Sequence, residues 1–370
     1  MRVTCERNQL TAALGVVNRA VANRNTIQIL NNVLIEAEGE ELKLTATDLD
    51  TSISNVIAAK VDESGALAVP GRVLGDVVSR MPDAPITLEL QDGKVKVQCG
   101  KSSYVILSLP AEDFPATRQV TEGEELEFPQ SELKEALRLT AFAASREENR
   151  SILMGVLFEA KETEFLLVAT DTHRLALKKL NLPKPVSKPL SAVIPARPLG
   201  EIERLLKDSA EETVKINIGS GQVQVSVNNV TLVSRLLDGQ FPNYEKVLPA
   251  TTERKVRFSR SEMLDALKRL EIVAFHSAEK IRIATQGDAL ELTAESADVG
   301  SGREYVPISM DGEDITIAFN ARYVMEVLDH LTSDNAVLEL TGPLNPGLIK
   351  SAEGTTVRDD FSYVVMPMQI

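Results

Sequence analysis

The sequence predicts an α+β protein built from three tandem copies of one domain, each with two helices packed on antiparallel sheets. Two observations support this fold class: short segments recur at a nearly constant interval, and two apolar helical patterns alternate with many short period-two strands. The chain has 370 residues, which is long enough for several domains with cores of their own.

The recurring segments are separated by 123 to 127 residues. Three markers recur. The first comprises Leu44–Asp48, Leu167–Asp171 and Leu292–Glu295, and the second comprises Val69–Leu74, Ile194–Leu199 and Phe319–Val324. The third marker occurs twice, as Leu109–Pro115 and Leu237–Pro242. This interval places the domains at residues 1–118, 124–249 and 252–370, with polar linkers near 117–123 and 250–254.

Each domain is expected to contain two amphipathic helices. Leu10, Ala13 and Leu14 share one helical face, and the same apolar pattern returns 123 residues later. Ser131 and Ser261 are expected to cap helices. The expected helices cover residues 7–20, 71–81, 130–143, 196–207, 260–274 and 320–331.

The rest of each domain alternates apolar and polar residues with period two and breaks at glycine turns. Residues 86–90 precede Asp92-Gly93, and residues 223–227 follow a glycine-rich turn at 219–221. This pattern predicts roughly eight strands in each domain.

Several kinds of site are excluded by composition. Cys5 and Cys99 are too few and too far apart for a disulfide framework, and the three histidines are not at metal-ligand spacing. We therefore expect no metal and no cofactor. No apolar run approaches the roughly 20 residues of a membrane span, and the N-terminus has no signal-peptide core, so a cytoplasmic protein is expected.

Asp171 and His173 allow the hypothesis of an enzyme with a cleft between domains. A nucleophilic hydrolase would need a sharply turned serine such as Gly-x-Ser-x-Gly, and the sequence has none. Asp171 is matched by Asp48 and Glu295 in the other copies, so the acid is a repeat feature expected at a turn or strand end. We therefore expect a protein that is not an enzyme.

The charge distribution allows two interpretations. The formal net charge is -14, but the six expected helices carry +3 and the rest of the chain -17. This difference is consistent with ordinary salt-bridge patterning on helix surfaces. Alternatively, the helices line a shared surface that faces a polyanion and contacts phosphates without reading bases.

The three markers resemble those of the bacterial DNA polymerase III β subunit, the sliding clamp. Ala169–Leu175, Leu237–Tyr244 and the C-terminal Tyr363–Met368 resemble the same family, and the resemblance covers the whole chain. It implies three clamp domains per chain and a head-to-tail homodimeric ring, with sheets outside and helices around a hole.

Such a ring would encircle duplex DNA, slide without sequence specificity and act as a processivity factor for the replicative polymerase, without catalysis. The implied partners are DNA, a second copy of the chain, the polymerase catalytic subunit, the clamp loader, and other polymerases and repair proteins that carry clamp-binding peptides; no membrane is implied. A repeat scaffold that does not bind DNA remains an alternative hypothesis.

The resemblance also implies site residues. Cations near the hole would be Arg24, Arg72, Arg80, Arg146, Arg150, Arg197 and Arg204. Glu147 stands where family members carry a neutral amide, which weakens the expectation that this loop grips DNA. The implied dimer contacts are Tyr104, Ile106, Ile272 and Val273.

A peptide-binding groove is implied between the second and third domains. Its residues would be Leu153, Thr170, Thr172, His173, Arg174, Leu175, Pro242, Lys246, Val247, Asn320, Tyr323, Val364, Val365, Met366, Pro367 and Met368. The apolar members suit an apolar peptide side chain. Residues 364–368 could also be a buried last strand, and both interpretations can hold together.

Overall fold

The computed structural model describes residues 1–22, 27–117, 119–249 and 251–370. Packing groups the chain into two units, residues 1–130 with 204–236 and residues 131–203 with 237–370. None of the helices in these ranges is long and apolar enough to cross a membrane.

Six α-helices in the described ranges follow the six predicted segments. They are α1 (Arg7–Val17), α2 (Gly71–Ser79), α3 (Gln130–Thr140), α4 (Ala196–Leu205), α5 (Arg260–Ala274) and α6 (Ala321–His330). The two predicted caps are wrong. Helix α5 begins at Arg260, as predicted, but its N-cap is Ser259, whose Oγ accepts from the Glu262 N–H, and Ser131 lies inside α3.

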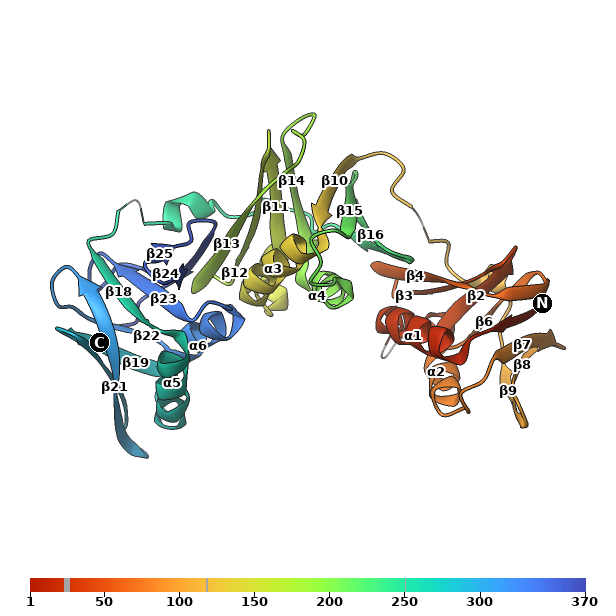
Figure 1. Cartoon of the computed structure of the whole chain (residues 1–370), viewed down its shortest axis with the longest axis horizontal. Helices are drawn as coiled ribbons and strands as arrows, with labels where there is room; N and C mark the ends of the chain where they lie inside the picture. Colours follow the sequence, from red (N-terminus) through yellow and green to blue (C-terminus); the bar gives the residue numbers. More distant parts are fainter. Residues whose placement is uncertain (23–26, 118, 250) are drawn as a thin grey trace. The chain divides into compact units, whose positions relative to one another are not determined.

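The first unit contains two antiparallel sheets and the helices α1 and α2 (Figure 1). A five-stranded sheet has the order β5-β1-β7-β8-β9, and an eight-stranded sheet has the order β10-β15-β16-β17-β4-β3-β2-β6. Helix α1 packs against α2 and buries Leu10, Ala13 and Leu14, facing β3 and β4. The strands are β1 (Arg2–Cys5), β2 (Asn32–Glu38), β3 (Glu41–Thr47), β4 (Thr51–Ala58), β5 (Lys60–Glu63), β6 (Gly65–Pro70), β7 (Ile86–Gln91), β8 (Lys94–Cys99), β9 (Ser102–Leu107), β10 (Glu124–Pro129), β15 (Thr213–Ile218), β16 (Gln222–Val227) and β17 (Val230–Arg235).

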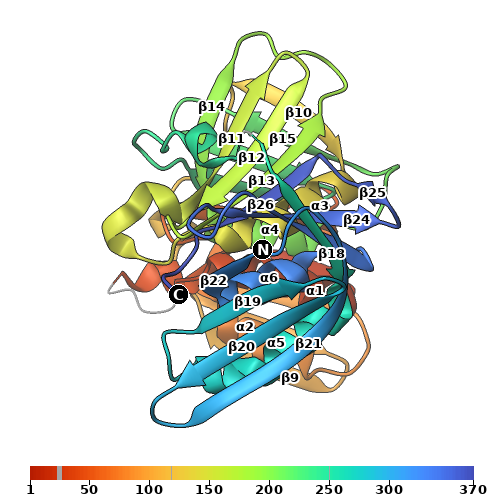
Figure 2. The same ribbon diagram turned by 90° about the vertical axis from the view of Figure 1, so that its left-hand side faces the viewer.

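The second unit contains a 13-stranded antiparallel sheet. Its order is β14-β11-β12-β13-β26-β24-β23-β18-β21-β20-β19-β22, with β25 beside β24. The long strand β21 pairs with β18 at its C-terminal end and with β20 at its N-terminal end, as Figure 2 shows. The strands are β11 (Gly155–Lys161), β12 (Glu164–Thr170), β13 (Arg174–Asn181), β14 (Leu190–Pro195), β18 (Arg254–Ser259), β19 (Lys280–Gln286), β20 (Ala289–Ser296), β21 (Gly300–Asp311), β22 (Thr316–Asn320), β23 (Asn335–Leu340), β24 (Gly347–Glu353), β25 (Thr356–Val357) and β26 (Phe361–Val365).

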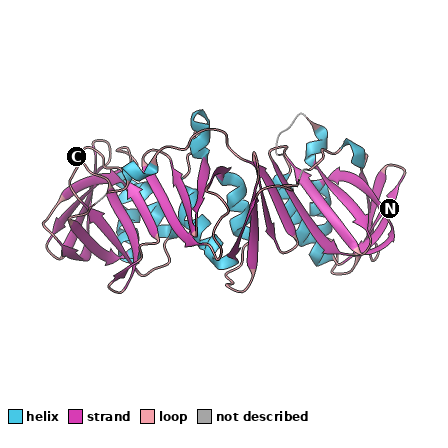
Figure 3. Ribbon diagram, turned by 90° about the horizontal axis from the view of Figure 1, so that it is seen from above, coloured by secondary structure: helices cyan, strands magenta, loops and turns pink. Residues whose placement is uncertain are grey.

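The sheets of the two units differ, but in each unit a pair of helices packs on neighbouring strands in the same way. Helix α5 packs against β20 and β21, and α6 packs beside α5, as α1 and α2 do in the first unit. Figure 3 shows the helices of each unit (cyan) against its strands (magenta). The predicted α+β class is therefore confirmed.

The acid of the first marker has the same role in the first two copies. Asp48 Oδ1 accepts from the N–H groups of Asp50 and Thr51 at 3.2 and 2.8 Å. Asp171 Oδ1 accepts from those of His173 and Arg174 at 3.0 and 3.1 Å. These are turns in which a carboxylate replaces backbone acceptors. In the third copy Glu295 lies near the end of β20, so the expected turn or strand-end role is confirmed.

A buried ion cluster ties β13 to the segment before β26. The Lys178 side chain is 1% exposed, and its Nζ lies 2.9 Å from Glu135 Oε2 and 2.6 Å from Asp360 Oδ2. Arg358 contacts the same two carboxylates at 3.0 and 2.6 Å. The buried charge of Lys178 is therefore paired with two partly buried carboxylates, as a low-dielectric interior requires.

This cluster should make the protein acid-labile. Burial would raise the pKa of Glu135 and Asp360, but hydrogen bonds from Arg358 and Lys178 outweigh it and lower both pKa values below 4.5 and 3.8. A carboxyl with a lowered pKa stabilises the fold above its unfolded pKa, and this stability is lost as pH falls through the folded pKa. Thermal midpoints measured from pH 8 to 3 should stay level to about pH 5 and then fall. A midpoint that rose on acidification would contradict this.

Candidate functional site

An apolar hollow of about 190 Å³ lies in the second unit. It is formed by the turn before β13, by β13 and β26, and by the segment that contains the 3-10 helix Tyr244–Val247. Its lining residues are Thr170, Thr172, Arg174, Leu175, Pro242, Asn243, Tyr244, Val247, Val364 and Met366.

Strand pairing creates the floor of the hollow. Leu175 and Val364 are direct cross-strand partners in β13 and β26, so their side chains share one face of the sheet. Leu157, Val168 and Leu177 pack in the same apolar cluster. A floor of this kind is fully formed without a ligand, which suits binding of an apolar side chain.

The wall beside β13 is a strained turn. Thr172 has a φ of 80°, a left-handed conformation that β-branched residues rarely adopt. Its N–H donates to Thr170 Oγ1 at 3.1 Å, and Arg150 donates to its hydroxyl at 2.8 Å. The equivalent residue of the first copy, Leu49, has a φ of 82°. Such strain is maintained by the surrounding structure and commonly marks functional positions.

Arg174 holds the turn against α6. Its Nε donates to Asp171 at 2.9 Å, and its other nitrogens donate to Glu326 and to the Phe142 carbonyl. The guanidinium also lies 4.6 Å from the centre of the Tyr323 ring. Burial would raise the pKa of Glu326, but its hydrogen bond with Arg174 outweighs burial and lowers the pKa.

These contacts account for Asp171 and His173 without catalysis. Both carboxylate oxygens of Asp171 accept hydrogen bonds from its own turn and from Arg174. The exposed His173 ring stacks on Tyr323 with centroids 6.2 Å apart. The acid is therefore engaged in building the turn that borders the hollow.

Eight of the sixteen residues expected in a groove line the hollow, and two more lie beside it. The eight that line the hollow are Thr170, Thr172, Arg174, Leu175, Pro242, Val247, Val364 and Met366. His173 and Tyr323 lie beside these residues, because the Tyr323 ring stacks with His173 and contacts the Arg174 guanidinium. Among the remaining six, Lys246 is exposed, Pro367 and Met368 are partly buried, and the Met368 N–H donates to the Ala318 carbonyl at 2.8 Å.

Three expected groove residues have structural roles instead. Val365 alternates with Val364, so it lies on the opposite face of the sheet, where it is fully buried. Leu153 is also buried. Asn320 caps α6, because its Oδ1 accepts from the N–H groups of Arg322 and Tyr323.

Sequence reasoning missed two lining residues, Asn243 and Tyr244. The Tyr244 hydroxyl donates to Glu159 at 2.6 Å. The pKa of the tyrosine is raised, mainly by burial and in addition by this carboxylate. Both residues directly follow Pro242 in a segment that carried the resemblance, so their position was a usable signal.

The corresponding surface of the first copy is polar. Thr51 pairs with Ser234 and Ser52 with Val233, as Arg174 pairs with Val365 and Leu175 with Val364. Ser52 therefore occupies the place of Leu175, and the hydroxyl makes the floor less suited to an apolar group.

The expected DNA-contacting arginines are exposed wherever they are described. Arg72 and Arg80 lie at the two ends of α2, and Arg197 and Arg204 lie on α4. Arg146 and Arg150 lie between α3 and β11, with Glu147 3.8 Å from Arg150. Arg24 lies outside the described residues.

The expected dimer contacts fall on two exposed apolar patches, with one exception. Tyr104 lies on the edge strand β9, and Ile272 lies near the end of α5, where Val273 is half-buried. Ile106, in contrast, is a buried residue of β9, paired with Val95 of β8. Its neighbours Val105 and Leu107 are exposed apolar residues, as Tyr104 is.

Comparison with known proteins accounts for the whole chain. Family models match in order: DNA polymerase III beta subunit N-terminal domain over residues 1–118, central domain over 127–243 and C-terminal domain over 245–369. The beta sliding clamps of Synechococcus elongatus and Caulobacter vibrioides are 34% and 31% identical, each match covering 100% of both chains.

Solved structures give the same result. The DNA polymerase III subunit beta from Pseudomonas aeruginosa matches with a TM-score of 0.94 at 30% identity, covering 100% of both chains. The sliding clamp from Bartonella birtlesii bound to griselimycin matches with a TM-score of 0.94 at 31% identity, again over 100% of both chains. The three consecutive domains, the complete coverage and the shared fold establish that this chain belongs to the DNA polymerase III beta subunit family, the bacterial sliding clamps.

Proposed function

We propose that two copies of this chain close head to tail into a ring around duplex DNA, and that the ring slides and tethers the replicative polymerase. The observation that carries this proposal is the full-length match of three tandem domains to beta sliding clamps. In this role the chain is a processivity factor and catalyses no reaction.

The charge distribution supports a topological hold on DNA. With -14 on the whole chain and +3 on the predicted helices, electrostatic attraction to phosphates is weak and screened by salt. A ring does not need strong attraction, because it stays on DNA by enclosure. Weak contacts from exposed arginines such as Arg72 and Arg197 would then allow sliding.

Retention on DNA should depend on DNA topology. With a clamp loader and ATP supplied, we expect the protein to stay on closed circular DNA and to leave within minutes after the circle is cut once. Gel filtration separates DNA-bound from free radiolabelled protein, so it measures both retention on the closed circle and release after the cut. Equal retention on circular and linear DNA would contradict enclosure and would favour ordinary binding.

Exposed apolar residues support the ring interface. Leu107 on β9 is 71% exposed, and Ile272 and Phe275 near the end of α5 are 73% and 69% exposed. Strand β9 is a sheet edge, and in the described residues β21 pairs only with β20 along 300–307. Pairing these edges between two copies would cover both.

Light scattering should therefore give a mass of about 81 kDa, twice the 40.4 kDa of the chain. Leu107→Asp should shift the protein toward the monomer mass, because a carboxylate would be buried in an apolar seam. Leu49→Asp, at another exposed leucine, is the matched control and should stay dimeric. A wild-type monomer at micromolar concentration would argue against ring closure.

The apolar hollow beside Met366 is proposed as the docking site for partner peptides. Its floor of Leu175 and Val364 would take an apolar side chain, and the exposed His173 and the ring of Tyr323 would border the rest of the peptide. Met366 adds an adaptable wall, which suits several different peptides. The partners would be polymerases, the clamp loader and repair proteins.

A further inference from the structure

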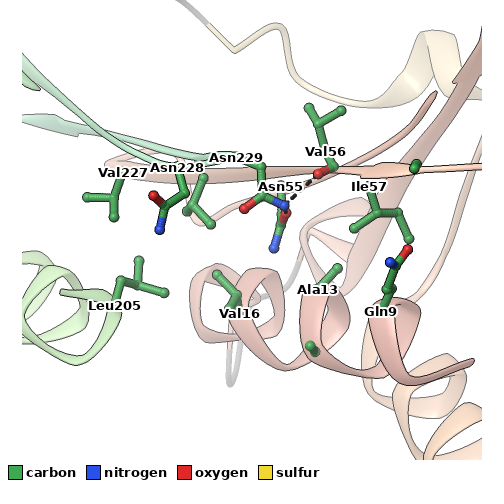
Figure 4. Close-up of a pocket in the computed structure, with 13 residues that line it drawn as sticks. Gln9, Ala13, Val16, Asn55, Val56, Ile57, Leu205, Val227, Asn228 and Asn229 are labelled. Atoms are coloured by element: carbon green, nitrogen blue, oxygen red, sulfur yellow. Dashed lines mark hydrogen bonds between the residues drawn. The ribbon is translucent and has the colours of Figure 1, made fainter. Parts of the chain in front are cut away.

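A second hollow, of about 400 Å³, lies in the first unit and takes no part in the proposed peptide docking. It is bordered by α1, by β4, by the turn that joins β16 to β17 and by the end of α4 (Figure 4). Its volume is within the range of small-molecule sites.

The repeat shows what occupies this place in the second unit. An offset of 123 residues aligns Asn55 with Lys178 and Ala12 with Glu135. Val230 pairs with Asn55 as Phe361 pairs with Lys178, so Asn229 corresponds to Asp360. The hollow therefore corresponds to the buried ion cluster, with small neutral residues in place of large charged ones.

This replacement leaves an amide donor that faces the hollow and has no acceptor among the described residues. Asn55 is 5% exposed, and its Oδ1 accepts from Asn229 Nδ2 at 2.8 Å. Its own Nδ2 makes no hydrogen bond to any described residue, and Figure 4 shows it pointing from β4 toward α1. In the second unit Lys178 has a carboxylate at this point, supplied by Glu135. At the matching position Ala12 has no acceptor to offer.

The lining determines what ligand could supply the acceptor. No Asp, Glu, Lys, Arg or His is among the residues described around the hollow. A charged ligand would therefore lose its hydration without a counter-charge, whereas a neutral carbonyl would not. Val16, Leu205 and Val227 offer apolar walls, and the Asn228 amide lies beside them in Figure 4.

We propose that this hollow is a binding site for a neutral, planar ring compound that carries a carboxamide or lactam, whose carbonyl accepts the hydrogen bond from Asn55 Nδ2. The ring lies against the apolar walls, and the N–H of the ligand amide faces the carboxamide side chains at the rim. The site is separate from the hollow beside Met366, so a ligand here need not compete with a partner peptide.

Methyl NMR of the full-length protein tests this proposal with nicotinamide as the probe. We expect saturable shifts of the Ala13, Val16 and Leu205 methyl groups, with a dissociation constant of roughly 1–10 mM for a ligand of this size. Nicotinate has the same shape and a negative charge, and it should bind at least about tenfold more weakly. Equal binding of the two compounds, or no saturable shift with nicotinamide, would overturn the proposal.

Three variants test the role of Asn55. Asn55→Leu should weaken nicotinamide binding at least about tenfold, since it removes the donor at similar volume. Ala12→Gln should also abolish binding, because the added side chain fills the hollow and supplies the missing acceptor, whereas Ala12→Ser should bind as the wild type does. If Asn55→Leu does not fold, the two Ala12 variants decide: unchanged binding to Ala12→Gln would refute the site.

Discussion

Replacing Met366 by glutamate should weaken binding of a polymerase-derived peptide by at least about a hundredfold, since burying a carboxylate in an apolar pocket costs about 3 kcal/mol or more. Met366 lines the hollow, yet its side chain is 37% exposed, so the substitution leaves the core intact. Its backbone N–H donates to the His173 carbonyl at 2.9 Å, and this bond is unaffected by the side chain.

Fluorescence anisotropy with a labelled peptide from the C-terminal end of the polymerase catalytic subunit measures the effect. Val73→Glu is the matched control, because Val73 is also a half-exposed apolar residue and lies on α2 in the other unit. The control should bind the peptide like the wild type. If Met366→Glu kept wild-type affinity while folded, the hollow would not be the peptide site.

The same structure explains why a deletion is a poorer test than this substitution. Val364 and Val365 are fully buried in β26, which pairs with both β13 and β24. Removing residues 364–370 would therefore open the core of the second unit as well as the hollow. Loss of binding in such a variant would not distinguish a missing site from a misfolded one.

Replacing Lys178 by methionine should lower the free energy of unfolding by about 3 kcal/mol, because it leaves two partly buried carboxylates that only Arg358 still neutralises. The side chain keeps its approximate length, so the change is mainly one of charge. In a unit of this size the thermal midpoint should fall by roughly 6–12 °C.

Lys179→Met is the matched control, because Lys179 is the exposed neighbour of Lys178 on the same strand. Chemical denaturation at pH 7 should show the control within about 0.5 kcal/mol of the wild type. The deficit of Lys178→Met should shrink as pH falls below the carboxyl pKa values, since protonation of Glu135 and Asp360 removes their mutual repulsion. A deficit equal to that of the control would mean that the cluster contributes no net stability.

The ion cluster and the Asn55 hollow show how one repeated backbone gives two different interiors. Lys178 and Asn55 occupy matching strand positions in the repeat, and Glu135 and Ala12 occupy matching positions on the preceding helices. Neither residue type by itself predicts burial, since lysine and asparagine are usually exposed. Their burial depends on strands β26 and β17, which come from later parts of the chain and pair beside them.

The helices were predictable because their signal is local. Apolar residues spaced by three and four positions mark α1 and α3, and the structure places these helices within the predicted ranges. The caps were less predictable, since Ser259 and Ser261 are equally good candidates by composition. The choice of Ser259 depends on where β18 ends and α5 begins.

The groove residues were identified through family resemblance, and the structure sorted them. Thr170, Leu175 and Met366 line the hollow, whereas Val365 and Asn320 serve the core and a helix cap. Successive residues of a strand point to opposite faces of the sheet, so resemblance over a segment cannot separate ligand-facing from core-facing residues.

The threefold repeat, the paired helices and the α+β class were predictable because each depends on spacing along the chain, and the family was recognisable from its motifs. Only the folded chain shows which repeated positions form an apolar hollow, an ion cluster or the hollow that the Asn55 amide donor faces. These interiors depend on long-range contacts, because antiparallel pairing of β13 with β26, and of β4 with β17, joins residues far apart in the chain. Their register decides which side chains meet, and no local pattern encodes that register.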